Sequence, residues 1–188
     1  RGLRDRFTTL AAALEKIDPA CGFNIEIKYP LPSEERSTGF LAPERNMFVD
    51  RVLDVVFAKA RSRPIVFSSF DPDIALLVAR KQAIFPVLFL TAAGTDSTAD
   101  PRRASLRAAV GFARSIGLLG VVSHTNPIIH APRLIDAVHA NGLVLATFGR
   151  ENNDIEAVKL QRSKGVSLLI IDHVSHVSKA LQGSSTNE

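Results

Sequence analysis

Six short runs of apolar, mostly β-branched residues recur along this chain, and an amphipathic stretch follows each of them. Most runs are nearly continuous Val, Ile, Leu and Phe, which is typical of parallel strands with helices on both sides of the sheet. Their spacing fits successive strand–helix units and therefore predicts an α/β fold with a parallel sheet. The predicted strands are Phe23–Tyr29, Ile65–Ser69, Val87–Thr91, Gly120–Ser123, Val144–Phe148 and Ser167–Ile171.

Helices are predicted between these strands from the spacing of apolar residues and from capping signals. Asp71 followed by Pro72 suits the free amides at a helix start. Asn141-Gly142 is a typical helix stop, and Asn153 with Glu156 has the spacing of a capping box. The predicted helices are Leu3–Ile17, Met47–Ala60, Asp71–Gln82, Arg103–Ile116, Pro132–Ala140, Asn153–Ser163 and Val174–Leu181.

This succession of units fits either a doubly wound open sheet or most of a (β/α)8 TIM-type barrel. A glycine-rich phosphate loop would favour the open sheet, but the chain contains no GxGxxG and no Walker sequence. We therefore favour the barrel. Six strands do not close a barrel of eight. The expected fold is thus an incomplete barrel over residues 1–181, with strands three to eight present and the first two missing upstream of Arg1, followed by a disordered tail at 182–188.

Composition excludes several classes of protein. The single cysteine, Cys21, allows no disulfide within the chain, so we expect a reducing, cytoplasmic location. A buried or partly buried Cys21 is expected, with a nucleophile as the alternative. The longest apolar stretch, Ala83–Gly94, is interrupted by Pro86 and is too short to span a membrane. The net charge of +4 arises from scattered cations, so no nucleic-acid surface is expected.

The first predicted strand carries the most site-like pattern. Its side chains alternate, so Asn24, Glu26 and Lys28 share one face opposite an apolar face. In a barrel this polar face points inward, and burying its charges is costly unless they are paired, metal-bound or hydrated. Glu26 and Lys28 also lie at the carboxyl end of the strand, where barrel active sites form. A solvated polar face on an edge strand is the alternative.

Four segments of the chain together resemble the glycerophosphodiester phosphodiesterase family. The match is to its eukaryotic branch, which includes glycerophosphocholine phosphodiesterases and fungal phosphate-regulation proteins, and it covers residues 7–181. The segments are Asn-Ile-Glu-Ile-Lys at 24–28, Ile-Val-Phe-Ser-Ser-Phe-Asp-Pro-Asp at 65–73, Pro-Val-Leu-Phe-Leu-Thr at 86–91 and Gly-Arg-Glu-Asn-Asn-Asp at 149–154.

The resemblance implies a barrel that hydrolyses glycerophosphodiesters to glycerol 3-phosphate and an alcohol with the help of a divalent cation. Glu26 matches the family's metal-ligand glutamate, and a carboxylate suits Mg²⁺ or Ca²⁺. Lys28 matches the lysine that faces the substrate phosphate, where its charge would stabilise the phosphoryl oxygens. Phe70 matches a position beside the substrate.

The chain also departs from the family pattern. The family's two acid–base histidines and its other acidic metal ligands match no residue here and would precede Arg1, in a region that could include additional domains. No catalytic residue is therefore expected within this chain, and the 188 residues alone should show no turnover. A degenerate, non-catalytic phosphate-signalling domain is the alternative. A third hypothesis is an unrelated barrel enzyme that acts on a phosphorylated metabolite.

Several other polar residues follow predicted strands. His124 is expected to cap a loop, with substrate contact as the alternative. Asn152 and Asn153 are expected to cap a helix rather than touch substrate. Asp172 either caps the last helix or helps order the site. The insertion Pro30–Arg45 leaves the strand end that carries Lys28, and it is either a lid or a surface insertion.

Overall fold

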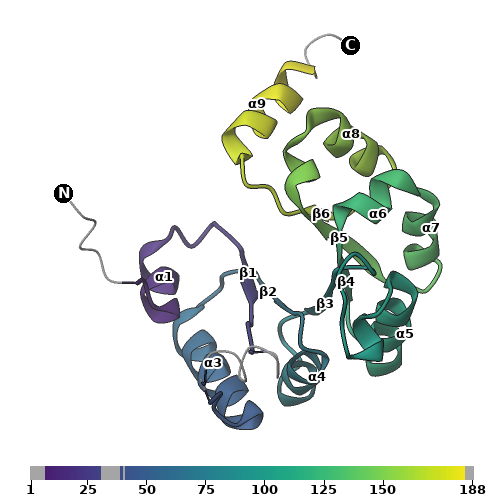
Figure 1. Cartoon of the computed structure of the whole chain (residues 1–188). Coiled ribbons are helices and arrows are strands. Elements are labelled where there is room, and N and C mark those ends of the chain that lie inside the picture. Colours follow the sequence, from purple (N-terminus) through teal and green to yellow (C-terminus); the bar gives the residue numbers. More distant parts are fainter. Residues whose placement is uncertain (1–6, 31–38, 40, 185–188) are drawn as a thin grey trace.

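The computed structural model describes residues 7–30, 39 and 41–184. Their strands form one parallel sheet in sequence order (Figure 1). The strands are β1 (Phe23–Glu26), β2 (Ile65–Ser69), β3 (Val87–Thr91), β4 (Gly120–His124), β5 (Val144–Phe148) and β6 (Leu168–Leu169). All six predicted strands are confirmed, although β1 and β6 are shorter than expected because their outer edges have no pairing strand among the described residues.

Helices alternate with the strands as predicted. They are α1 (Leu10–Lys16), α3 (Arg45–Lys59), α4 (Pro72–Lys81), α5 (Leu106–Ile116), α6 (Thr125–His130), α7 (Arg133–His139), α8 (Ile155–Ser163) and α9 (Val174–Ser184). Two 3-10 turns, η1 (Pro101–Arg103) and η2 (Arg150–Asn153), and the short α6 were not predicted. No helix in the described part of the chain has the length and apolar character needed to span a membrane.

The capping predictions had mixed outcomes. Asp71 caps α4 as expected, because its Oδ1 accepts the Asp73 and Ile74 amides at 2.8 and 3.0 Å. The capping box at Asn153 was wrong: Asp154 is the N-cap of α8. The Asn153 side chain instead accepts the backbone amides of Asp172 and His173, so it links η2 to the segment before α9.

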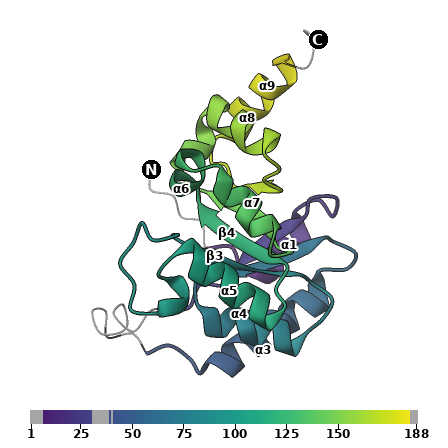
Figure 2. The same ribbon diagram turned by 90° about the vertical axis from the view of Figure 1, so that its right-hand side faces the viewer.

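The sheet curls into a half-barrel with two different faces. Helices α3, α4, α5 and α7 pack along its outer face and bury the main apolar core (Figures 1 and 2). A smaller apolar cluster lies on the inner face, where Leu88, Leu90, Val122 and Ala146 are buried. Side chains alternate along each strand, so the same strands serve both clusters.

Arg63 fastens α1 to the beginning of the sheet. Its side chain is almost fully buried, and its guanidinium donates to the carbonyl oxygens of Leu14 and Ile17, which close α1. It also lies 4.4 Å from the centre of the Phe23 ring. The guanidinium satisfies carbonyls that a helix end leaves without partners and so links α1 to the beginning of β1.

Cys21 is exposed, which corrects the expectation of burial. It lies in a turn closed by the bond from its amide to the Asp18 carbonyl, and β1 begins only at Phe23. The side chain therefore precedes the packed part of the strand.

Some predictions concern residues outside the described ranges. These are residues 3–6 of the first predicted helix, most of the 30–45 insertion and residues 185–188 of the predicted tail. Residues 7–9 of that predicted helix are described and are not helical, because Thr9 is the N-cap of α1. Helix α9 extends through Ser184, so residues 182–184 lie in a helix.

Candidate active site

The polar face of β1 lies on the inner side of the half-barrel. Asn24 and Glu26 are in register with Val66 and Ser68 of β2, and the Ser68 hydroxyl donates to Asn24 Oδ1 at 2.9 Å. Val66 packs against the inner apolar cluster, so the polar residues of β1 share that side of the sheet. The predicted inward direction is confirmed. The face is nevertheless exposed, because β1 is an edge strand of the described sheet.

Glu26, Lys28 and Phe70, the three predicted site residues, line one cavity of about 310 Å³. It opens where β1 and β2 end, which is the edge at which barrel active sites form. Residues from the loop after β3 also reach this cavity. The remaining lining residues are Ile27, Tyr29, Asp71, Asp96 and Arg103.

Glu26, which ends β1, and Lys28, which follows it, remain available to a ligand. Lys28 Nζ lies 3.9 Å from Glu26 Oε1, and 81% of the Lys28 side chain and 34% of the Glu26 side chain are exposed. An exposed pair at this distance contributes little to stability. Neither charge is therefore committed to holding the fold together.

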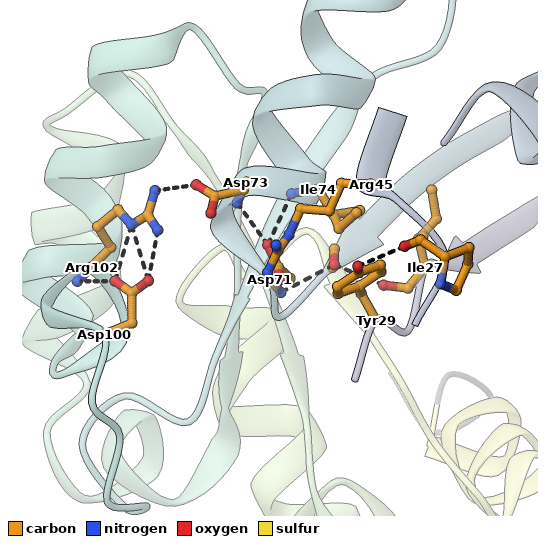
Figure 3. Close-up of polar contacts among 10 residues, drawn as sticks. Ile27, Tyr29, Arg45, Asp71, Asp73, Ile74, Asp100 and Arg102 are labelled. Atoms are coloured by element: carbon orange, nitrogen blue, oxygen red, sulfur yellow. Dashed lines mark hydrogen bonds and ion pairs between the residues drawn. The ribbon is translucent and has the colours of Figure 1, made fainter. Parts of the chain in front are cut away.

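Asp71, in contrast, serves the structure (Figure 3). Besides capping α4, its Oδ2 accepts from Arg45 Nη2 at 3.1 Å. The Arg45 guanidinium lies 4.5 Å from the centre of the Tyr29 ring, and the Tyr29 hydroxyl donates to the Pro43 carbonyl at 2.8 Å. These contacts brace the cavity wall and leave the Asp71 carboxylate with partners of its own.

Phe70 stands at the end of β2, between the cavity and the inner cluster. It packs edge-to-face on Phe148 with ring centres 5.6 Å apart, and Arg103 lies 5.5 Å from its ring centre. His124 contacts the other aromatic, Phe148, at 5.3 Å, and its Nδ1 accepts the Asn126 amide at 3.2 Å. His124 thus caps the unpredicted helix α6, where a loop was expected, and it is not among the residues that line the cavity.

Sequence reasoning missed Arg103 and Asp96. The adjacent arginines Arg102 and Arg103 were counted only among the scattered cations, but the structure gives them different roles. Arg102 bonds Asp100 and Asp73 (Figure 3), while Arg103 lines the cavity. Their position shortly after β3 was the available signal, because the loops at the carboxyl ends of barrel strands form the site.

The described residues do not form a complete metal site. No group of three His, Cys, Asp or Glu side chains able to hold an ion occurs among them. Glu26 offers one carboxylate, whereas Mg²⁺ takes six oxygen ligands and Ca²⁺ six to eight. Only a partial match to a cation site is therefore present in this part of the chain.

A buried polar network lies beneath the carboxyl end of β5. Asn152, Thr125, Thr147 and Gln161 are all fully buried. Asn152 Oδ1 accepts from Thr125 at 2.8 Å and from Gln161 at 2.9 Å, and its Nδ2 donates to the Ile170 carbonyl at 3.0 Å. The expectation that Asn152 caps a helix is corrected: its amide joins η2, α6, α8 and the segment after β6.

The segment that follows β6 is also tied to η2. Asp172 does not cap α9 within the described contacts; its Oδ2 accepts from Asn153 Nδ2 at 3.3 Å. Together with the Asn153 bonds to the amides of Asp172 and His173, this contact orders the loop before α9.

A model of the glycerophosphoryl diester phosphodiesterase family matches residues 2–176. The chain belongs to this family. The resemblance seen in the sequence is thereby confirmed. Glycerophosphocholine phosphodiesterase GDE1 of Eremothecium gossypii is 45% identical to this chain. The match covers 93% of this chain and 13% of the length of GDE1. Glycerophosphodiester phosphodiesterase GDPD1 of Arabidopsis thaliana is 38% identical over 95% of this chain and 48% of its own length. The chain thus spans less than half of either relative.

Solved structures of phosphodiesterases share the fold. The glycerophosphodiester phosphodiesterase of Thermotoga maritima has a TM-score of 0.60 at 20% identity, covering 93% of this chain and 63% of that one. A phosphodiesterase of Oleispira antarctica, in complex with the product sn-glycerol-3-phosphate, has a TM-score of 0.59 at 16% identity, covering 86% of this chain and 55% of that one. The α/β half-barrel of this chain therefore resembles part of each of these phosphodiesterase structures.

Proposed function

We propose that the full-length protein containing this chain hydrolyses glycerophosphodiesters, such as glycerophosphocholine, to glycerol 3-phosphate and an alcohol. The observation that carries the proposal is the cavity that Glu26, Lys28 and Phe70 share at the carboxyl ends of β1 and β2. Two further observations support it. The curated relatives include glycerophosphocholine phosphodiesterases, and the Oleispira antarctica phosphodiesterase was solved with sn-glycerol-3-phosphate.

Each of the three side chains suits one part of such a substrate. The Lys28 ammonium would neutralise the charge that develops on the phosphoryl oxygens. The Phe70 ring would pack against the carbon skeleton next to the phosphate. Glu26 would serve as one ligand of Mg²⁺ or Ca²⁺, which polarises phosphoryl oxygens when bound. The remaining metal ligands and the acid–base groups would come from outside the described residues.

The outer edge of β1, which pairs with no strand among the described residues, supports a proposal about the complete fold. We propose that two further strands pair beside β1 and that β1 to β6 are strands three to eight of a complete barrel. The exposed polar face of β1 would then become enclosed, and the apolar inner cluster would gain partners. The exposed thiol of Cys21 agrees with the cytoplasmic location that we propose.

A second function would need less of the protein. The described lining of the cavity includes a cation, Lys28, and an aromatic ring, Phe70, which suit the binding of a phosphate compound. A phosphate-sensing domain that binds glycerol 3-phosphate without turnover would need only the groups seen here.

Incubating the full-length protein with glycerophosphocholine separates the two functions. The enzyme proposal expects sn-glycerol 3-phosphate and choline to appear in equal amounts, which coupled enzymatic assays measure. Binding of sn-glycerol 3-phosphate with no release of choline at any Mg²⁺ or Ca²⁺ concentration would refute the enzyme and support the sensing domain.

Replacing Glu26 with Gln tests its proposed metal role. The substitution keeps the shape but removes the charge that attracts a divalent cation, so the Mg²⁺ or Ca²⁺ concentration for half-maximal activity should rise at least about tenfold. Titrating the metal into chelator-treated full-length protein measures this. Glu44→Gln is a matched control, since Glu44 caps α3 away from the cavity lining. An unchanged metal requirement would exclude Glu26 as a ligand.

A further inference from the structure

Arg103 is a cation without an acidic partner beside the candidate site. Its Nε is buried and has no hydrogen-bond partner. Among the described residues, its guanidinium forms no ion pair or hydrogen bond, and it lies 5.5 Å from the centre of the Phe70 ring. Its charge also acts at longer range on Asp100, where it helps to lower the pKa of the carboxyl. A buried donor without a partner is costly, and most such groups in folded proteins are satisfied. The Nε atoms of Arg45 and Arg63 are buried without partners as well, so this feature alone does not single out Arg103. Its place on the cavity wall does.

The neighbouring arginine shows how differently the fold treats a structural cation. Arg102 donates to Asp73 at 2.7 Å and to both carboxylate oxygens of Asp100 (Figure 3). The bond from Arg102 lowers the pKa of Asp100, so this carboxylate stays charged. Both carboxylates that contact the Arg102 guanidinium are thus paired with it. Arg103 leaves the same 3-10 turn, η1, but forms no hydrogen bond or ion pair with either carboxylate and acts on Asp100 only through the longer-range attraction of its charge.

Arg103 also lines the cavity that holds Glu26, Lys28 and Phe70. Lys28 and Arg103 are thus two cations on one cavity, contributed by the segment after β1 and the loop after β3. A guanidinium presents parallel N–H groups that fit two oxygens of one phosphoryl group, whereas an ammonium acts as a point charge. A phosphodiester carries two non-bridging oxygens and one negative charge. The two oxygens can accept the two parallel N–H groups of one guanidinium.

We propose that Arg103 binds the phosphoryl group of the substrate together with Lys28. This inference rests on the proposed function and deepens it, because it adds a substrate-binding residue from a different strand–helix unit. Phe70 supports the guanidinium by a cation–π contact and keeps it directed along the cavity wall. The phosphoryl oxygens would accept charge-assisted hydrogen bonds from the guanidinium.

The proposal is tested by comparing the phosphate affinity of the Arg103→Met variant with that of the wild type, both as full-length protein. Isothermal titration calorimetry with inorganic phosphate and with sn-glycerol 3-phosphate should show affinities lowered about ten- to hundredfold, as expected for the loss of a charge-assisted hydrogen bond. The KM for glycerophosphocholine should rise by a similar factor. Arg103→Lys should recover part of the loss, because it restores the charge without the fork.

Two further variants separate ligand binding from a structural effect. Arg107→Met removes an exposed arginine of α5 and should leave phosphate affinity within about threefold of wild type. In a Phe70→Leu background, Arg103→Met should still weaken phosphate binding, because the guanidinium contacts the anion directly. If the effect of Arg103→Met disappears in that background, Arg103 only positions Phe70 and the proposal is wrong.

The outcomes also distinguish this inference from the proposed function. Wild-type protein that binds phosphate through Arg103 but releases no choline would support the inference and refute the hydrolase. Choline release with phosphate affinity unchanged in Arg103→Met would support the hydrolase and overturn the inference. A wild-type protein that binds neither phosphate nor sn-glycerol 3-phosphate would overturn the inference as well.

Discussion

Lys28→Met is expected to lower kcat/KM for glycerophosphocholine about 10²- to 10³-fold in the full-length protein. A single preorganised donor to a developing oxyanion is worth this much in other enzymes. Lys28 is suited to the role because it lies just beyond the carboxyl end of β1 and its ammonium is paired only loosely, 3.9 Å from Glu26 Oε1. Methionine keeps most of the length of the side chain and removes the charge. The release of choline at several substrate concentrations measures the effect.

Stability should change little in the same variant, because an exposed ion pair is worth about 1 kcal/mol or less. Lys81→Met is the matched control: Lys81 Nζ lies 2.8 Å from Asp50 Oδ1, away from the cavity lining, and the change should leave kcat/KM within about threefold. A Lys28→Met protein that retains full activity would remove Lys28 from the phosphoryl site.

Asn152→Ala is expected to lower the local free energy of opening at the carboxyl end of β5 by roughly 3–5 kcal/mol. The amide is fully buried and bonds Thr125, Gln161 and the Ile170 carbonyl. Alanine leaves these groups buried without partners, each at a cost of about 1–3 kcal/mol. Hydrogen exchange measured by mass spectrometry on β5 and α8 in the full-length protein reports this opening.

Asn153→Ala provides the comparison at the adjacent position. Its bonds to the amides of Asp172 and His173 are exposed, so its loss should cost about 1 kcal/mol or less. Equal increases in exchange for the two variants would show that the buried network does not hold this end of the sheet together.

Local patterns predicted the strands and the helix positions well. The nearly continuous apolar runs became β2, β3 and β5 with the predicted bounds, because packing helices against such runs leaves few alternatives. Predictions at the turns were weaker. Asn153 was taken for a helix cap, and Asp154 holds that place instead. Asn153 and Asp154 are both residue types that cap helices. The contact that draws Asn153 away from the helix is with Asp172, nineteen residues further along the chain.

The site was predictable only in part. Alternation along β1 placed Glu26 and Lys28 on one face, and the family resemblance added Phe70. Nothing local distinguished Arg103 from Arg102, since both follow Pro101 in the same turn. Their difference depends on Asp73, which lies in α4 and reaches Arg102 but not Arg103 among the recorded contacts.

The amino-acid sequence by itself determined the α/β class, the order of strand and helix, and the polar face of β1, because side-chain alternation and helical periodicity are local properties of the chain. Only the tertiary structure decided that this face is an exposed edge, that Asn152 is buried among hydroxyl and amide groups, and that Arg103 joins Glu26, Lys28 and Phe70 around one cavity. Those outcomes depend on which strands pair and on where loops from separate units meet, and both are set by long-range packing.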